Sequence, residues 1–344
     1  MKLKKQFEDF YKEIKIDDEI EDLKEKREIL EEDIKNKLPT EMEKHGITLK
    51  KSDIEIFDQG SYKLNTTISD KEGSIDRDVA VMFPLDKSEN PDTRKIKGYV
   101  RDSLKHNNRT ITIKEPCVNV SYAEGGVEWL HIDLPIYAKC DNTVYLARGR
   151  ENSTEGNYGW EEADPKGLND WQLNEINGNQ QLRRIIRYIK KWKQEKYRNS
   201  TLDHEIPPSI GITLLAIDGF SSCNTEEGDD DLTSLQQTLQ KMVNKFSLTY
   251  DGSGTIIKAD ISRLLPVKPF TDVFKKMKDC SDSYGIKFYN RLSVALQHLT
   301  DACNESSEHD AGISVQKVFG DDFQVPAKQA TNSNASSQKE HNFG

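Results

Sequence analysis

Three aspartates lie in two segments that alternate like β-strands. Asp76 and Asp78 are two positions apart in the segment 75–83, and Asp133 lies in the segment 127–138. Side chains at positions i and i+2 of a strand point to the same face, roughly 6.5–7 Å apart. Mg²⁺ prefers oxygen ligands and is commonly shared between a few carboxylates and the phosphates of a substrate. The pattern therefore predicts a divalent-cation site for phosphoryl transfer, with Asp76, Asp78 and Asp133 as catalytic ligands.

The residues around these aspartates indicate buried strands. Ile75, Val79 and Val81 have the opposite parity to the aspartate pair and predict an apolar face. Asp133 likewise alternates with apolar residues, which are Leu130, Ile132, Leu134 and Ile136. An ionised carboxylate in so apolar a run is costly unless it is paired, hydrogen-bonded or bound to a metal. Taken alone, each segment has a second interpretation, an alternating strand whose polar face meets water.

A Gly-Ser pair precedes the aspartates. Gln59, Gly60 and Ser61 directly follow a short alternating segment at 53–57. A Gly-Ser turn at the start of a helix lets backbone N–H groups and a hydroxyl approach phosphate oxygens closely. Most such pairs are only turns, but this one stands between a strand and a carboxylate pair. We therefore expect Gln59, Gly60 and Ser61 to bind a nucleotide.

The ordered set of motifs resembles the DNA polymerase β-like nucleotidyltransferase superfamily. More narrowly, the chain is similar to the bacterial relatives of cyclic GMP–AMP synthase and oligoadenylate synthase, the CD-NTases of anti-phage signalling. The resemblance runs from about Phe57 to Val325. Beyond the Gly-Ser turn and the aspartates it includes the segments 131–137, 160–171, 187–192, 208–210 and 318–323. The insertion 65–74 is longer than in the most compact members of the superfamily.

The resemblance implies an α+β fold, in which a polymerase-β-like mixed sheet with helices packs on a C-terminal helical domain. Nucleoside triphosphates (ATP, GTP or others) would bind between the two domains. Asp76 and Asp78 would hold two Mg²⁺ ions, with Mn²⁺ as a substitute, and Asp133 would complete the metal site at the attacking hydroxyl. Lys190 and Ser209 match positions that contact the triphosphate from the helical side. Lys193 lies within one turn of Lys190 and is expected to share that task.

The implied activity is the synthesis of a cyclic di- or trinucleotide second messenger, most similar to cyclic GMP–AMP, with release of pyrophosphate in CBASS signalling. One alternative is a nucleotidyltransferase that extends RNA or modifies a small molecule. The net charge of −10 and the absence of a recognisable RNA-binding module count against RNA extension and against stable nucleic-acid binding. The other alternative is an inactive nucleotide-binding interaction protein, which would have no need for the three aspartates.

The elements that must position these residues change character along the chain. A long charged helix is predicted from about Leu3 to Pro39, within an N-terminal segment 1–50 that packs on the core. Strands with few helices between them follow in a catalytic domain, 51–165, and predict a mixed sheet covered on one side. A polar, Gly-rich loop leads to Lys166. The helical domain, 166–328, shows helical patterning at 182–197, 209–220, 232–246 and 284–304.

The amino-acid composition bears on where the protein is expected to reside. Charged residues make up 31% of the 344 residues, and no run approaches the roughly 18 apolar residues of a membrane helix. The amino terminus lacks the apolar core of a signal peptide, so we expect no membrane association and a cytoplasmic protein. The five cysteines form no C-x-x-C pair and are expected to be reduced, mostly buried thiols.

The polar segment 329–344 is expected to be a flexible tail. The resemblance suggests that its last residue, Gly344, is a conjugation site for a ubiquitin-transfer-like enzyme, since glycine has no side chain to crowd such an active site. A disordered remnant is the alternative. Among aromatic residues, Tyr62, Trp160 and Tyr188 are candidates to stack on a base, although core packing is the default for each.

Overall fold

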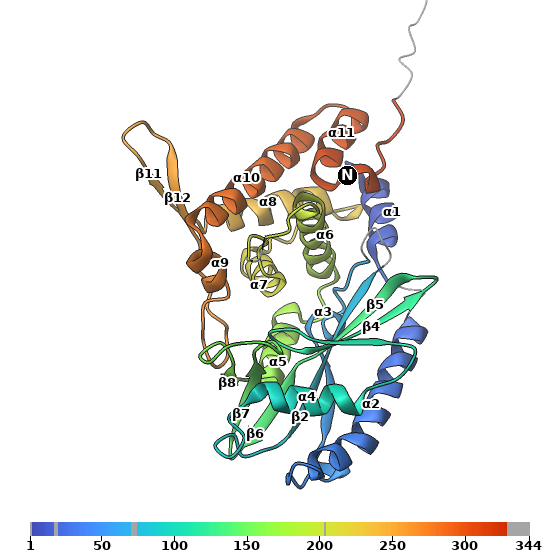
Figure 1. The fold of residues 1–344 in the computed structure, drawn as a ribbon. Coiled ribbons are helices and arrows are strands. Elements are labelled where there is room, and N and C mark those ends of the chain that lie inside the picture. Colours follow the sequence, from blue (N-terminus) through green and yellow to red (C-terminus); the bar gives the residue numbers. More distant parts are fainter. Residues whose placement is uncertain (1, 17–19, 70–73, 203, 329–344) are drawn as a thin grey trace, which may run out of the picture.

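The computed structural model describes residues 2–16, 20–69, 74–202 and 204–328. Figure 1 shows a β-sheet with helices at its sides in one half of the molecule and a group of helices in the other. The α+β class is thereby confirmed, with a mixed sheet next to a C-terminal helical region. Within the described ranges, every helix is too short or too polar to cross a lipid bilayer.

The large sheet lies in the segment 51–165, which is expected to be the catalytic domain, and has the order β3-β4-β5-β2-β6-β7-β8, with β1 paired to β2. Its strands are β1 (Glu55–Gln59), β2 (Ile75–Pro84), β3 (Thr110–Ile113), β4 (Val118–Glu124), β5 (Val127–Leu134), β6 (Ile136–Cys140), β7 (Thr143–Arg148) and β8 (Gly159–Ala163). The run 127–138, expected as one strand, is divided into β5 and β6. Strand β8 lies in the segment that was expected to be a loop.

Strand β2 is the centre of this sheet. It is parallel to β5 and then to β6 in one continuous register, because only Pro135 separates these two strands. Proline has no N–H to donate, and its carbonyl instead accepts a hydrogen bond from the Val81 backbone N–H at 3.0 Å. On its other side β2 pairs with β1, antiparallel. The aspartates of β2 therefore stand on a strand that is held from both sides.

One face of the sheet is covered by α2 (Ile20–Glu43) and α4 (Thr93–Ser103). The apolar parity predicted from the sequence is buried here. Ile75, Val79, Leu130 and Ile132 join Leu23, Leu30, Ile34, Ile96 and Val100 in one cluster. The opposite face carries the aspartates. Further along β2 that face is covered as well, by the small cluster of Ala80, Met82 and Tyr137.

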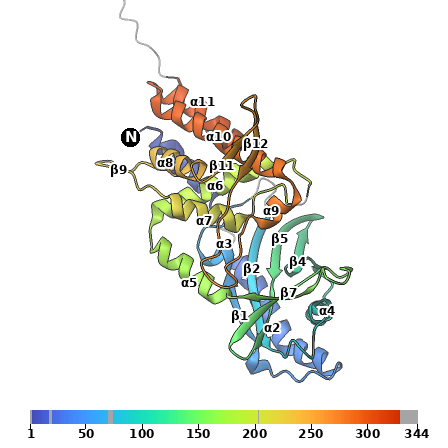
Figure 2. The ribbon, with the colours of Figure 1, turned by 90° about the vertical axis from the view of Figure 1, so that its left-hand side faces the viewer.

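The helical domain is built around α6 (Gln180–Tyr197), which packs against α7 (Ser209–Gly219), α8 (Asp231–Val243) and α11 (Glu308–Phe319). The long α10 (Asp282–Asn304) lies along α8 and α11. The hairpin of β11 (Ser247–Tyr250) and β12 (Ile256–Asp260) projects from this domain in Figures 1 and 2. Smaller elements are α3 (Gly60–Lys63), α5 (Pro165–Ile176), α9 (Lys275–Cys280), and the hairpin of β9 (Asn224–Thr225) and β10 (Gly228–Asp229).

The prediction of a single helix from about Leu3 to Pro39 is wrong. The described residues form α1 (Lys4–Ile14) and α2, and Lys15 after α1 is extended and pairs with Ile68. The physical reason is that the two helices belong to different cores. Phe7 and Phe10 of α1 pack among the helices of the C-terminal domain, whereas α2 packs on the sheet.

The cysteines are free thiols, and Cys117 is the buried one among the five. Cys140, Cys223 and Cys303 are partly buried and Cys280 is exposed. The expectation of mostly buried thiols is therefore wrong. Cys280 is exposed because it ends the short helix α9 at the surface. The tail segment 329–344, including Gly344, lies outside the described residues.

Candidate active site

Four polar side chains form a row across adjacent strands of the sheet. Gln59 of β1 is in register with Asp78 of β2, Asp78 with Asp133 of β5, and Asp133 with Asn119 of β4. Asp76, two positions before Asp78, stands on the same face. The structure thus brings together the three aspartates that the sequence predicted as a site.

Asp133 is oriented by two donors. The Asn119 amide donates to Asp133 Oδ1 at 2.7 Å, and the Lys114 ammonium lies 3.3 Å from the same oxygen. One oxygen of the carboxylate is thus held by Asn119 of β4 and by Lys114, and the carboxylate also interacts with the Cys117 thiol. Asn119 was missed in the sequence, although it is a polar residue on the cleft-facing parity between the buried Val118 and Val120.

The three carboxylates concentrate negative charge. Burial raises the pKa of Asp78 to about 7, and the charges of Asp133 and Asp76 act in the same direction. The ammonium groups of Lys190 and Lys114 oppose this rise only in part. A bound cation would stabilise the ionised form of all three carboxylates.

The Gly60–Ser61 turn touches this carboxylate group directly. Gly60 has a φ of +63°, a conformation that favours glycine, and a Cβ atom placed on it would lie 2.3 Å from Asp78 Oδ2. Gly60 opens the short helix α3 directly after β1. The Ser61 hydroxyl lies 3.2 Å from the Thr67 hydroxyl at the edge of the cleft. Only glycine lets the backbone of the turn pass so close to the Asp78 carboxylate.

Helix α6 supplies the cations opposite the aspartates. The Lys190 amine is buried and donates to the Thr66 carbonyl at 3.1 Å and to the Thr66 hydroxyl at 3.2 Å. Burial lowers the pKa of Lys190 to about 7, helped by the charges of Lys193 and Arg187. Burial also lowers the pKa of Lys193 to about 8, and its amine donates to the Ser209 hydroxyl. Both amines would gain a proton more readily beside a polyphosphate.

The same face of α6 binds the segment that follows the Gly-Ser turn. Arg187 donates to the Thr67 carbonyl at 3.1 Å and to the Asn65 side chain at 3.3 Å, and Arg183 donates to the Leu64 carbonyl at 3.3 Å. Together with Lys190, these bonds tie the helical domain to 64–67. The first half of the insertion 65–74 is therefore part of the interface between the two domains.

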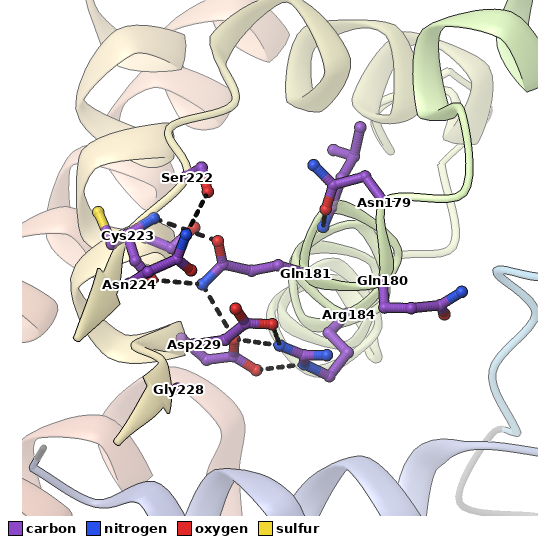
Figure 3. A network of polar contacts seen from close by, with 12 residues as sticks. Asn179, Gln180, Gln181, Arg184, Ser222, Cys223, Asn224, Gly228 and Asp229 are labelled. Carbon is purple, nitrogen blue, oxygen red and sulfur yellow. Dashed lines mark hydrogen bonds and ion pairs between the residues drawn. The ribbon is translucent and has the colours of Figure 1, made fainter. Parts of the chain in front are cut away.

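Another face of α6 is anchored in the helical domain, as Figure 3 shows. Arg184 donates to both carboxylate oxygens of Asp231, at 2.6 and 2.8 Å, and to Asp229 at 2.8 Å. Gln181 donates to the Cys223 carbonyl at 2.9 Å. These contacts fix the rotation of α6 about its axis and thereby the direction in which Lys190 and Lys193 point.

A cleft of about 680 Å³ lies between the two domains. Every residue that the sequence analysis assigned to metal or nucleotide binding lines it, namely Gln59, Gly60, Ser61, Asp76, Asp78, Asp133, Lys190, Lys193 and Ser209. The volume lies within the range of about 300–1,000 Å³ that is usual for ligand sites.

The cleft also has lining residues that the sequence did not reveal. Tyr137 donates to Gln59 at 3.3 Å, and Glu161 and Glu162 come from β8. The loop after β12 adds Lys268, whose amine lies 2.8 Å from Glu162. Glu161 and Glu162 were missed because their segment was interpreted as a loop, so that no strand parity was assigned to them.

Of the three candidate stacking residues, Tyr188 lies in the protein core, whereas Tyr62 and Trp160 are partly buried and pack against the core of the sheet. Tyr188 is fully buried and donates to Asp231 at 3.0 Å, and the Trp160 indole donates to the Asn90 carbonyl at 2.8 Å. Tyr62 packs against the guanidinium of Arg77. The aromatic ring that does line the cleft is Tyr137.

The donor set fits a hard divalent cation. Asp76, Asp78 and Asp133 are oxygen donors on one face of the sheet, and burial together with repulsion from Asp133 and Asp76 raises the pKa of Asp78, a repulsion that a cation would remove. In the described part of the chain, no three His, Cys, Asp or Glu side chains are grouped closely enough to hold a metal ion by themselves. A Mg²⁺ ion at the aspartates would therefore need further ligands from water and substrate phosphates, as Mg²⁺ usually does.

Part of the chain is similar in sequence to known nucleotidyltransferases. Residues 54–137 match the family model of the nucleotidyltransferase domain of cyclic GMP-AMP synthase DncV-like proteins. The match contains the Gly-Ser turn and all three aspartates and ends before α6. A cyclic GMP-AMP synthase from Escherichia albertii is 29% identical over 175 residues, which are 47% of this chain and 36% of that protein. The alignment thus spans about a third of the length of that relative.

The fold has close counterparts among solved structures. The apo form of Vibrio cholerae DncV superposes with a TM-score of 0.66 at 16% identity, covering 92% of this chain and 96% of that one. The same protein, described as a cyclic AMP-GMP synthase in complex with the linear intermediate 5′ pppA(3′,5′)pG, gives 0.62 at 17% identity, covering 94% and 99%. Escherichia coli DncV bound to 3′-deoxy GTP gives 0.64 at 15% identity, covering 90% and 93%. The likeness therefore extends over both domains.

Proposed function

We propose that this chain is a CD-NTase of the DNA polymerase β-like superfamily, whose DncV-like nucleotidyltransferase domain residues 54–137 match, and that it joins nucleoside triphosphates into a cyclic oligonucleotide. The observation that carries this proposal is the opposition of three carboxylates and two amines across one cleft. Carboxylates that hold divalent cations and amines that hold a polyphosphate are the parts that phosphoryl transfer requires. The product is proposed to be a cyclic di- or trinucleotide of the cyclic GMP–AMP kind.

Each group of residues has its own part in the proposed reaction. Asp76, Asp78 and Asp133 would hold Mg²⁺ or Mn²⁺, which would neutralise phosphate charge and lower the pKa of the attacking hydroxyl. The Gly60–Ser61 turn offers backbone N–H groups and a hydroxyl to the phosphates of the nucleotide. Lys190, Lys193 and Ser209 contact the polyphosphate from the helical side and orient it.

The bond changes follow from these positions. The ribose hydroxyl oxygen of one nucleotide forms a bond to the α-phosphorus of another, and its proton passes to solvent. The bond between the α-phosphorus and the bridging oxygen breaks, and pyrophosphate leaves with that oxygen. A second transfer within the linear product closes the ring and releases a second pyrophosphate, so that a cyclic dinucleotide and two pyrophosphates form together.

The test is incubation with the four nucleoside triphosphates and Mg²⁺ or Mn²⁺, followed by mass spectrometry. A cyclic product that resists phosphatase is expected, whereas nucleotide addition to supplied RNA would favour the RNA-extending alternative. Failure to consume any triphosphate would contradict the proposal.

Asp76→Asn and Asp78→Asn are each expected to reduce turnover by at least about 100-fold, because they remove negative charge while keeping side-chain size. Turnover is measured as pyrophosphate released, and folding as thermal denaturation. Asp9→Asn, on the exposed side of α1, is the matched control and should retain full turnover. If either cleft variant kept the turnover of the wild type, the assignment of the metal ligands would be wrong.

The place of this product in CBASS signalling also belongs to the proposal and rests on the resemblance of the chain to CD-NTases. Conjugation of Gly344 by a ubiquitin-transfer-like enzyme remains a prediction, since that residue lies outside those described. Deletion of Gly344 would abolish such conjugates if they form there.

A further inference from the structure

Arg77 is a buried cation between two catalytic aspartates. It stands on β2 between Asp76 and Asp78, and strand alternation directs it to the opposite face, where only 3% of its surface is exposed. Its neighbours on that face are apolar, among them Ile75 and Val79. A guanidinium in such a place is costly unless it is paired and its donors are satisfied.

The guanidinium of Arg77 connects three other elements. Its Nε and one terminal nitrogen contact Asp58 Oδ1 of β1 at 2.9 and 2.7 Å, and its other terminal nitrogen donates to the Leu23 carbonyl of α2 at 2.7 Å. The ring of Tyr62 in α3 covers the guanidinium, with 3.8 Å between the guanidinium carbon and the ring centroid. A guanidinium that makes two contacts with one carboxylate and also stacks on an aromatic ring is held in one orientation.

Two of these contacts flank the Gly-Ser turn. Asp58 is separated from Gly60 by a single residue, and Tyr62 directly follows Ser61. Helix α3 has only four residues, Gly60–Lys63, so its own hydrogen bonds cannot hold it in place. On the cleft side of β2, the same turn is in contact with Asp78. The turn is therefore fastened to β2 through Arg77 on one face and touches Asp78 on the other.

We propose that Arg77 is a positioning residue, which sets the distance between the Gly60–Ser61 turn and the carboxylates of Asp76 and Asp78. This inference rests on the proposed function, because it assumes that the turn and the aspartates act on one nucleotide. A displacement of about 1 Å between reacting groups can cost on the order of 100-fold in rate. Arg77 itself has no contact with substrate in this assignment.

The chain offers a matched control. Arg109 is also buried, pairs with Asp33 and donates to the Leu104 carbonyl at 2.7 Å, in the same domain. It is absent from the lining of the cleft. Arg77→Met and Arg109→Met each remove a buried guanidinium and leave a carboxylate behind, so both should lower thermal stability. Any difference between them in turnover then reports on the position and not on the loss of an ion pair.

The expected result is a selective loss of kcat. Arg77→Met should lower kcat by about 10- to 100-fold while the nucleotide KM changes by less than about threefold, because the contacts from Lys190 and Lys193 persist. Arg109→Met should keep kcat within about twofold. If Arg77→Met does not fold, the double variant Arg77→Met/Asp58→Asn removes the unpaired carboxylate and is measured in its place.

Tyr62 gives an independent arm of the test. Tyr62→Phe keeps the ring over the guanidinium and should behave like the wild type, whereas Tyr62→Leu should lose kcat. Combining Tyr62→Leu with Arg77→Met should cost less than the two single losses together, because both disturb one contact. Strictly additive losses would contradict the proposal.

A structural measurement separates this inference from the proposed function. In the protein without nucleotide, Arg77→Met should accelerate amide hydrogen exchange in α3 and leave α4 unchanged. If α3 exchanges as in the wild type, or if Arg77→Met and Arg109→Met lose kcat in proportion to their stability, the positioning role is refuted while the proposed function stands. If the wild type makes no product, the exchange measurement still decides the role of Arg77.

Discussion

Gly60 has a backbone conformation that favours glycine and also lies against the carboxylate of Asp78. Its positive φ disfavours any side chain, and its contact with Asp78 leaves no room for one. Gly46 has a similar φ of +77° but open space around it. Substituting alanine at Gly46 would therefore test the effect of backbone strain alone. The same substitution at Gly60 would add a collision with the Asp78 carboxylate.

Gly60→Ala is expected to abolish detectable turnover, because the methyl group would displace the Asp78 carboxylate or the turn itself. Gly46→Ala should lose about 1 kcal/mol of stability from the same backbone strain and keep its turnover. Pyrophosphate release and thermal denaturation check both variants. Turnover in Gly60→Ala equal to that of Gly46→Ala would show that the contact with Asp78 is irrelevant to catalysis.

The sequence predicted which face of the sheet carries the three aspartates, because strand alternation is a strong local signal. Asp76, Asp78 and Asp133 stand on the predicted face, and the apolar residues between them are buried. Arg77 shares the buried parity, which the sequence showed without indicating why a cation should be there. Its partners Asp58, Leu23 and Tyr62 come from three separate elements. Contacts of that kind depend on tertiary packing, so no local pattern predicts them.

At the scale of elements, α6 joins the two halves of the site. One face carries Arg183, Arg187 and Lys190 against 64–67, and another carries Gln181 and Arg184 against the β9–β10 region. The cleft lysines have lowered pKa values because the helix buries them before any phosphate is bound. Binding of a polyanion should reverse that effect.

Nucleotide binding at pH 8 is therefore expected to take up protons. Lys190, with a pKa of about 7, and Lys193, with a pKa of about 8, are partly neutral at this pH, and a triphosphate favours their charged forms. Asp78, with a pKa of about 7, is mostly ionised at pH 8 and contributes little. Calorimetry in buffers of different ionisation enthalpy counts the protons.

Lys190→Met should reduce this uptake, while Lys24→Met, on the exposed side of α2, should leave it unchanged. Proton release at pH 8, or equal uptake in all three proteins, would contradict the expected link between the buried amines and the phosphates.

Elements with weak sequence signals were the ones missed. Strand β8 lies in a polar, Gly-rich stretch, and α5 begins at Pro165 behind the capping side chain of Asp164. The β11–β12 hairpin is short and largely exposed, so it lacks the apolar alternation of a core strand. The helices α6, α7, α8 and α10 were predicted because each has an apolar face that packs on the others. Apolar periodicity thus reveals the core, whereas short elements without an apolar face, such as β8 and the β11–β12 hairpin, escape it.

At the scale of the molecule, the two domains meet through ion pairs at the rim of the cleft. Lys268 pairs with Glu162 at 2.8 Å, and Lys276 pairs with Glu115 at 3.2 Å. In both pairs the helical domain supplies the lysine and the catalytic domain supplies the glutamate. Exposed pairs of this kind contribute about 0–1 kcal/mol each.

Lys268→Glu is expected to weaken nucleotide binding by up to about fivefold at low salt, because it replaces attraction across the cleft by repulsion. The exchanged pair Lys268→Glu/Glu162→Lys should recover most of the loss, and salt at about 1 M should reduce the difference. Titration with a non-hydrolysable nucleotide measures the affinity.

The control for this prediction is Lys258→Glu, which disrupts an exposed pair with Asp282 away from the cleft and should not change affinity. An exchanged pair that binds as weakly as Lys268→Glu would show that the ion pair does not hold the domains together.

The separation of α1 from α2 has a consequence for biosynthesis. Phe7 and Phe10 of α1 pack against Tyr188, Phe319 and Phe323, and the Lys2 amine donates to the Ala302 carbonyl, 300 residues away in the chain. At about 5–20 residues per second, a ribosome needs about 15–60 s to make the intervening chain. The sheet and α2 have been synthesised long before then. The apolar side of α1 has no packing partners until the C-terminal helices are made. Because α1 is made well before its partners, its packing is a late step in the folding of this part of the nascent chain.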